Sequence, residues 1–198
     1  MMHPSPTLFG AGAWLFFPRS RAAAWSSALA EHEREIAGYV RRMEAVPRAA
    51  WAKPRADGRW HHAAEALHVV MAYELCVQAC REGRQMRLVV SPLVAWASRT
   101  VLLPLFLHTR TFPRNARAPR EVRPDMAVAI ALSREELVAR LQGAAHDASH
   151  RLHEADGLHP PFRLMHAYFG ALPPLTALRL LSAHTRHHTT VGLARITA

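Results

Sequence analysis

The sequence predicts an all-α fold, a four-helix bundle with an additional short helix and a long crossover loop. Five segments repeat their apolar residues with the 3.6-residue period of a helix, and no segment shows the alternation typical of a strand. The chain has 198 residues, of which 50% are hydrophobic and 20% are charged, enough to bury the core of one domain. We therefore expect an N-terminal extension at 1–19 and a single helical-bundle domain at 20–198.

The first two helices are expected at 20–45 and 60–82. A polar connection with helix breakers separates them, and Gly83 follows the second helix in the position that glycine favours after a helix end. The first helix has one apolar face and mostly polar residues elsewhere, as in a bundle. The apolar face consists of Trp25, Leu29, Ile36, Val40 and Met43.

The third helix is expected at 93–107, a short apolar segment whose first turn suits Pro92. The stretch 88–107 is long enough to span a bilayer, but Pro104 and a central Arg99 oppose insertion. We therefore expect a helix that is buried in the protein, and no association with a membrane.

The remaining helices are expected at 133–155 and 175–195. The first of them starts with an S-x-x-E capping box at Ser133. Its apolar face consists of Leu137, Leu141, Ala145, Ala148 and Leu152. The stretches 108–132 and 156–174 are rich in proline, so we expect irregular loops there, the first of which crosses over the bundle.

The formal charge of +10 comes almost entirely from arginine, since Lys53 is the only lysine. The arginines are scattered and no recognition motif accompanies them, so the charge permits anionic partners but indicates no specific nucleic-acid interface. Cys76 and Cys80 lie one helical turn apart, a poor geometry for a disulfide, and are expected as free thiols. The apolar stretch 8–17 has no preceding positive charge and is a poor signal peptide. We therefore expect a cytoplasmic protein.

Of the 14 histidines, the informative ones interrupt apolar helix faces. His184 and His188 lie one turn apart on such a face of the last helix, and His68 occupies a similar position in the second helix. A single inward histidine is more often a hydrogen-bonded core residue. Three inward imidazoles, however, leave buried polar atoms unpaired unless they share a metal ion. His187 lies about 100° from His188 around the helix and is expected to be a neighbour.

Other histidines and carboxylates are expected at the surface. His146, His150 and His153 have the spacing of metal ligands but lie beside charged residues. His61 and His62 lie at the start of the second helix, and Glu65 and Glu74 are carboxylates near His68 in the sequence. His32 lies on the apolar face of the first helix and is a further candidate for a fourth ligand or an outer-shell group. The sequence assigns no role to His166.

Three neutral histidines with an open fourth position are typical of a catalytic zinc-like centre, because structural zinc sites usually have four protein ligands. The open position would accept a water of lowered pKa or a substrate thiolate or oxygen. Zinc or nickel is the expected divalent metal ion, although imidazole also binds iron, cobalt and manganese. No general base is identified.

The order of these residues resembles the DinB-like (YfiT-like) superfamily of metal-dependent bacterial four-helix-bundle proteins. The shared pattern has a tryptophan near the start of the second helix, Trp60, a histidine eight residues later, His68, and an H-x-x-H-H element at 184–188. The segments 114–124 and 166–170 also resemble one uncharacterised branch of that superfamily.

The resemblance implies that His68, His184 and His188 are the metal ligands. It also implies a bundle that often forms a homodimer, with relatives that include thiol-dependent transferases and isomerases. The chain departs from the branch at Ala177, where tryptophan is common, and at Val191, where glutamine is common. The resemblance therefore carries over the ligands but no substrate.

Three functions remain open from the sequence. The first is a metal-dependent enzyme, either a hydrolase or a transferase that uses a low-molecular-weight thiol, acting on a small molecule. The second is a bundle that binds metal or a ligand without catalysis, which the two departures allow. The third and least favoured is a nonspecific nucleic-acid binder, which only the charge suggests.

Overall fold

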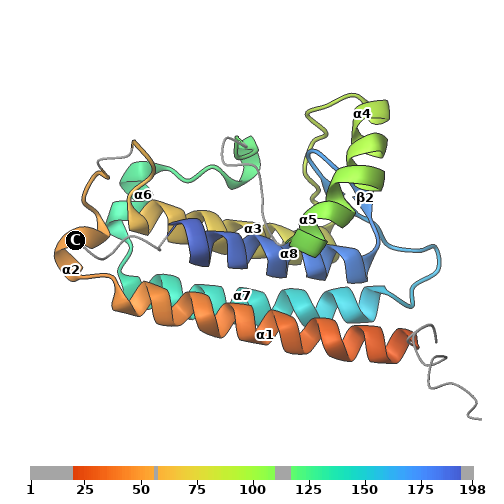
Figure 1. Ribbon diagram of the computed structural model, residues 1–198, viewed down its shortest axis with the longest axis horizontal. Coiled ribbons are helices and arrows are strands. Elements are labelled where there is room, and N and C mark those ends of the chain that lie inside the picture. The colour runs from red at the N-terminus through yellow and green to blue at the C-terminus, as the bar shows by residue number, and fades with distance from the viewer. Residues whose placement is uncertain (1–19, 56–57, 110–116, 193–198) are drawn as a thin grey trace, which may run out of the picture.

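The computed structural model describes residues 20–55, 58–109 and 117–192, and these are mostly helical (Figure 1). Four long helices pack side by side, α3 against α7 and α1 against α8, with further contacts between α1 and α7 and between α3 and α8. Their bounds are α1 Arg21–Ala45, α3 His62–Glu82, α7 Arg134–Ala155 and α8 Pro174–His187. The prediction of a predominantly helical protein is confirmed, while the extension expected at 1–19 lies outside the described residues.

The helix ends follow local capping signals. The side chain of Ser20 accepts a hydrogen bond from the backbone N–H of Ala23 at the start of α1. Ser133 and Glu136 form both bonds of the capping box at the start of α7. Gly83 follows α3 with φ of 69°, a left-handed conformation that glycine adopts without the steric cost of a Cβ. These boundaries were predicted correctly because they depend only on neighbouring residues.

The core lies between the long helices and is built from their apolar faces. All five residues predicted for the apolar face of α7 are buried, and α1 contributes Trp25, Ile36, Tyr39, Val40 and Met43. The hydroxyl of Tyr73 on α3 and that of Thr185 on α8 are hydrogen-bonded at 2.9 Å. Arg186 pairs with Glu35, which ties α8 to α1. The end of α8 is thus held on two sides.

The segments expected to be irregular contain short elements that the sequence did not predict. The connection after α1 holds α2 (Arg48–Trp51), and the crossover holds the 3-10 helix η2 (Arg120–Val122) and α6 (Met126–Ala131). Asp125 caps α6 by accepting hydrogen bonds from two backbone N–H groups. This capping signal was present in the sequence, but a six-residue helix is too short to show a period.

The expectation of an irregular loop at 156–174, with no strands, was wrong. The strands β1 (Leu164–His166) and β2 (Gly170–Leu172) form an antiparallel hairpin in which Leu164 pairs with Leu172. Strands of three residues are too short for an alternating pattern to be recognised. The hairpin lies next to the N-terminal end of α8, as Figure 1 shows.

The third predicted helix forms, but it is not buried as expected. It consists of α4 (Pro92–Ala97), the π-helical turn η1 (Ser98–Leu102) and α5 (Leu103–Thr109), and its α4 end projects away from the bundle (Figure 1). Its exposed large apolar residues are Leu93, Val94, Trp96, Val101, Leu102 and Leu105, with Leu93 73% exposed. Because apolar residues lie on most sides of this segment, its sequence could not show which side has a partner.

None of the helices within the described ranges is both long and apolar enough to cross a membrane. At the other end of the chain, α8 widens at His188 into the π-helical turn η3 (His188–Gly192). The predicted end of the last helix at residue 195 lies beyond the described part.

Candidate metal centre

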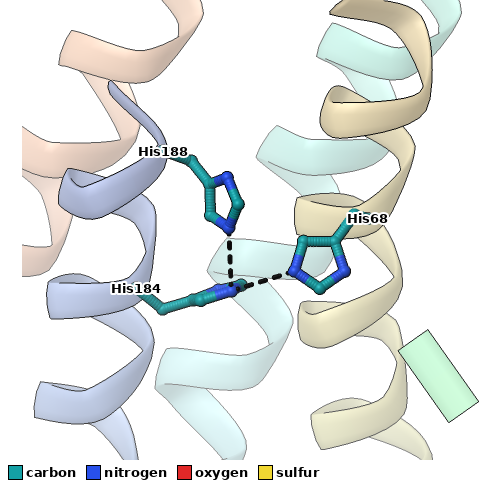
Figure 2. A group of neighbouring side chains, drawn as sticks. All are labelled: His68, His184 and His188. Carbon is teal, nitrogen blue, oxygen red and sulfur yellow. Dashed lines mark hydrogen bonds between the residues drawn. The ribbon is translucent and has the colours of Figure 1, made fainter. Parts of the chain in front are cut away.

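Three imidazoles from two facing helices converge on one point, as Figure 2 shows. His68 comes from the second turn of α3, His184 from the last turn of α8, and His188 from the start of η3. The Nε2 atom of His184 lies 3.1 Å from that of His68 and 3.1 Å from that of His188. The structure therefore brings together all three histidines that the sequence selected as metal ligands.

Two of the three spacings between the nitrogens are close to those of a tetrahedral metal ion, and all three ligand atoms lie within 4.8 Å of one another. Two imidazole nitrogens bound to zinc at its usual bond length are about 3.3 Å apart in a tetrahedral arrangement. The Nδ1 of His68 donates to the backbone carbonyl of Val122 at 2.7 Å, and the Nδ1 of His188 lies 2.8 Å from Oε1 of Glu65. In these neutral tautomers both Nε2 atoms are lone-pair acceptors, and the single proton of His184 cannot satisfy both. A cation at the point of convergence resolves this shortage of donors.

Glu65 orients His188 through a charge-assisted contact typical of metal sites, where a carboxylate fixes the tautomer of a ligating histidine. Its other oxygen pairs with Arg55 at 3.2 Å. The expectation that Glu65 is a surface carboxylate was wrong, because only 7% of the residue is exposed. Residues 61–70 are all buried, so this half of α3 has no exposed face for sequence periodicity to reveal.

The histidines are held in the neutral form that binds metals. Burial, reinforced by the neighbouring imidazoles, lowers the pKa of His184 and of His188 well below its ordinary value. Burial also lowers the pKa of His68. Burial raises the pKa of Glu65, and the positive charge of Arg55 opposes that rise.

Other predicted residues surround the centre without joining it. The indole of Trp60 packs against the imidazole of His68 with ring centroids 5.2 Å apart. His187 lies beside His188 at 5.4 Å, as a neighbour. His32 is buried against the ring of Tyr73 at 5.5 Å and is not part of the three-histidine group.

His166, to which the sequence gave no role, shapes the hairpin. Its Nδ1 accepts hydrogen bonds from the backbone N–H groups of Tyr168 and Phe169 in the turn between β1 and β2. Its side chain also lines the pocket next to the three histidines.

The remaining histidines divide into confirmed and corrected predictions. His146, His150 and His153 are exposed on α7, as predicted from the charged residues around them. The expectation that His61 and His62 are exposed was wrong, since both are 7% exposed. The Nδ1 of His61 accepts the backbone N–H of Ala64 and caps α3, a role that the sequence alone did not indicate.

The other predicted polar side chains also have defined surroundings. Glu74 makes a bidentate pair with Arg140 of α7, away from the centre. Cys76 and Cys80 are free cysteines, as expected. Cys76 is buried and lines the pocket, and its hydrogen bond with Cys80, together with burial, raises the pKa of its thiol.

A pocket of about 1130 Å³ opens from the three histidines and lies between α3 and α8. Arg59, Arg117 and Arg123 line it, whereas Glu65 is the single carboxylate among its lining residues in the described part of the chain. Most of its other lining residues are apolar. A metal ion here would face a space large enough for an organic molecule.

Comparison of the chain with protein-family profiles, with characterised proteins and with solved structures finds no match. The function of the site therefore rests on its own geometry.

Proposed function

We propose that the protein is a metal-dependent enzyme whose centre is a divalent ion held by His68, His184 and His188. The observation that carries the proposal is the convergence of three Nε2 atoms on one point at the wall of a large pocket. Zinc or nickel is the expected ion, because neutral imidazoles in a compact site suit both. The exposed side of the centre leaves the fourth position to a water or a substrate atom.

The residues around the centre fit a catalytic metal site better than a structural one with four protein ligands. Glu65 and the carbonyl of Val122 hold two imidazoles by their Nδ1 atoms, which aims the Nε2 atoms at the centre. When bound, the ion would supply Lewis acidity and lower the pKa of a water or thiol in the open position. Hydrolysis and thiol transfer both use such a group, and a cytoplasmic location would supply low-molecular-weight thiols.

The resemblance to the DinB-like bundle supports the same assignment. Trp60, His68 and the run 184–188 carry the resemblance; His68, His184 and His188 of this set form the centre, and Trp60 packs against His68. Ala177, one of the two departures, lines the pocket, so its effect falls on the shape of the substrate site and not on the ligands.

Metal analysis of the purified protein tests the proposal. We expect about one equivalent of a divalent ion in the wild type and a loss of nearly all of it in the double variant His184→Ala/His188→Ala. The matched control is His146→Ala/His150→Ala, a pair with the same spacing on an exposed face of α7, which should keep the ion. Equal metal content in the two double variants would refute the metal centre.

Turnover then separates an enzyme from a bundle that binds metal without catalysis. We expect hydrolysis of simple esters or transfer to thiol acceptors that is abolished by a chelator and restored by zinc or nickel. Stoichiometric metal without turnover of any substrate in such a screen would favour the non-catalytic function.

A further inference from the structure

The residues that line the pocket extend along two helices, α3 and α8, and we call this pocket the channel. Along α3 it is lined by His68, Ala72 and Ala79, and along α8 by His188 and Ala177. At 1.5 Å per residue, both rows extend about 16 Å from the histidines. The three alanines are the smallest side chains in these rows, which also include Leu75, Cys76, Leu180 and Leu181.

The far part of the channel is mostly apolar, although Gln85 and Ser98 also line it. Leu75 and Leu180 contribute from the walls, Met86 from the segment after α3, and Leu102 and Phe106 from the projecting helix, which covers this part of the channel. Phe169 of the hairpin packs against Phe106 with ring centroids 6.1 Å apart. Such a surface favours an apolar ligand by about 0.8 kcal/mol for each buried methylene.

The end near the histidines is positively charged. Arg59 lies close enough to lower the pKa of His188, and Arg123, whose guanidinium donates a hydrogen bond to the carbonyl of Ala118, also lines the channel. Glu65, the one carboxylate that lines the channel within the described residues, is already engaged by His188 and Arg55. A divalent ion would add to this positive charge, so the end with the histidines favours an anionic group.

We propose that the channel binds a single-chain amphiphile, with an anionic head at the metal centre and arginines and an unbranched apolar tail along α3 and α8. The inference deepens the proposed function and rests on it for the metal at the head end. The tail extends toward Phe106, and the head is the part presented for reaction.

Calorimetric titration with straight-chain alkanoates, from hexanoate to tetradecanoate and below their micelle concentrations, tests the channel. We expect zinc-loaded protein to bind each longer chain about fourfold more tightly per methylene until the channel is full. The matching alkanols, which lack the charge, should bind more weakly at every length. Affinity that does not depend on chain length would overturn the proposal.

Two alanines act as a ruler for the tail. Ala79→Met should shorten the channel, so that affinity stops rising at a shorter chain than in the wild type. Ala72→Met, two turns closer to His68, should stop the rise at a still shorter chain. Unchanged hexanoate affinity in Ala79→Met shows that the variant is folded. The same limiting length in wild type and Ala79→Met would contradict this placement of the tail.

The head is tested separately from the tail. Arg123→Gln should weaken alkanoate binding but not alkanol binding, while Arg120→Gln, an exposed neighbour in η2 that does not line the channel, should change neither. If the protein binds zinc but alkanoate affinity does not depend on chain length, the channel proposal is refuted and the metal centre is supported. Chain-length dependence in a protein that binds no zinc would support the channel and refute the metal centre.

Discussion

Replacement of Glu65 by glutamine tests how the centre is organised. The carboxylate accepts the Nδ1–H of His188 at 2.8 Å, and only 7% of Glu65 is exposed. Glutamine keeps the shape but removes the negative charge that strengthens this bond and the basicity of the imidazole. Loss of such a partner typically weakens metal affinity about 10–100-fold. This corresponds to about 1.4–2.7 kcal/mol in the free energy of binding.

Competition between the protein and a fluorescent chelator for zinc measures this change at pH 7. The matched control is Glu74→Gln, a second carboxylate of α3 that pairs with Arg140 away from the centre. We expect the control to bind zinc as the wild type does. Because Glu65→Gln also removes the partner of Arg55, the fold of each variant is checked by circular dichroism. Affinity within twofold of the wild type in a folded Glu65→Gln would refute the role assigned to this carboxylate.

Three further predictions concern stability and assembly. Burial lowers the pKa of His32 from its ordinary value of 6.5 to about 4. Below pH 6.5 the unfolded state therefore binds more protons than the folded state, and this residue should lower the free energy of unfolding by up to about 3 kcal/mol as the pH falls from 6.5 to 4. In urea titrations, the free energy of unfolding of His32→Leu should depend less on pH than that of the wild type or of the exposed control His146→Gln. Leu141→Ala, which empties a fully buried position of α7, should lower the free energy of unfolding by about 2–5 kcal/mol; a loss below 1 kcal/mol in urea titrations would contradict the packing described. Light scattering should give twice the mass of the chain, because the exposed apolar residues of α4 and α5 form a patch that monomers rarely leave uncovered. Trp96→Glu should shift the measured mass toward that of one chain. A monomeric wild type would refute the homodimer.

The sequence predicted the parts of the fold that neighbouring residues control. The bounds of α1 and α7, the capping box at Ser133 and the left-handed Gly83 are signals that act within one or two turns. The hairpin and α6 were missed because elements of three to six residues show no period. The exposure of the projecting helix was missed because an apolar sequence does not show which of its residues pack against the rest of the protein.

The candidate site shows the same division. The spacing of His184 and His188 placed both imidazoles on one face of the last helix, since a helix brings positions four apart onto the same side. His146 and His150 have the same spacing, and their charged neighbours were enough to place them at the surface. Glu65 was missed because its half of α3 is buried on every side.

The amino-acid sequence by itself determined the helices, their apolar faces and the set of three histidines that interrupts them. Only the tertiary structure decided that His68 meets His184, a residue 116 positions away, with their Nε2 atoms 3.1 Å apart. It also decided that Glu65 and the carbonyl of Val122 contact the Nδ1 atoms of His188 and His68, and that the three histidines line a channel. Such relations depend on how distant helices pack, and the period within each helix carries no information about the rotation and distance of its neighbour.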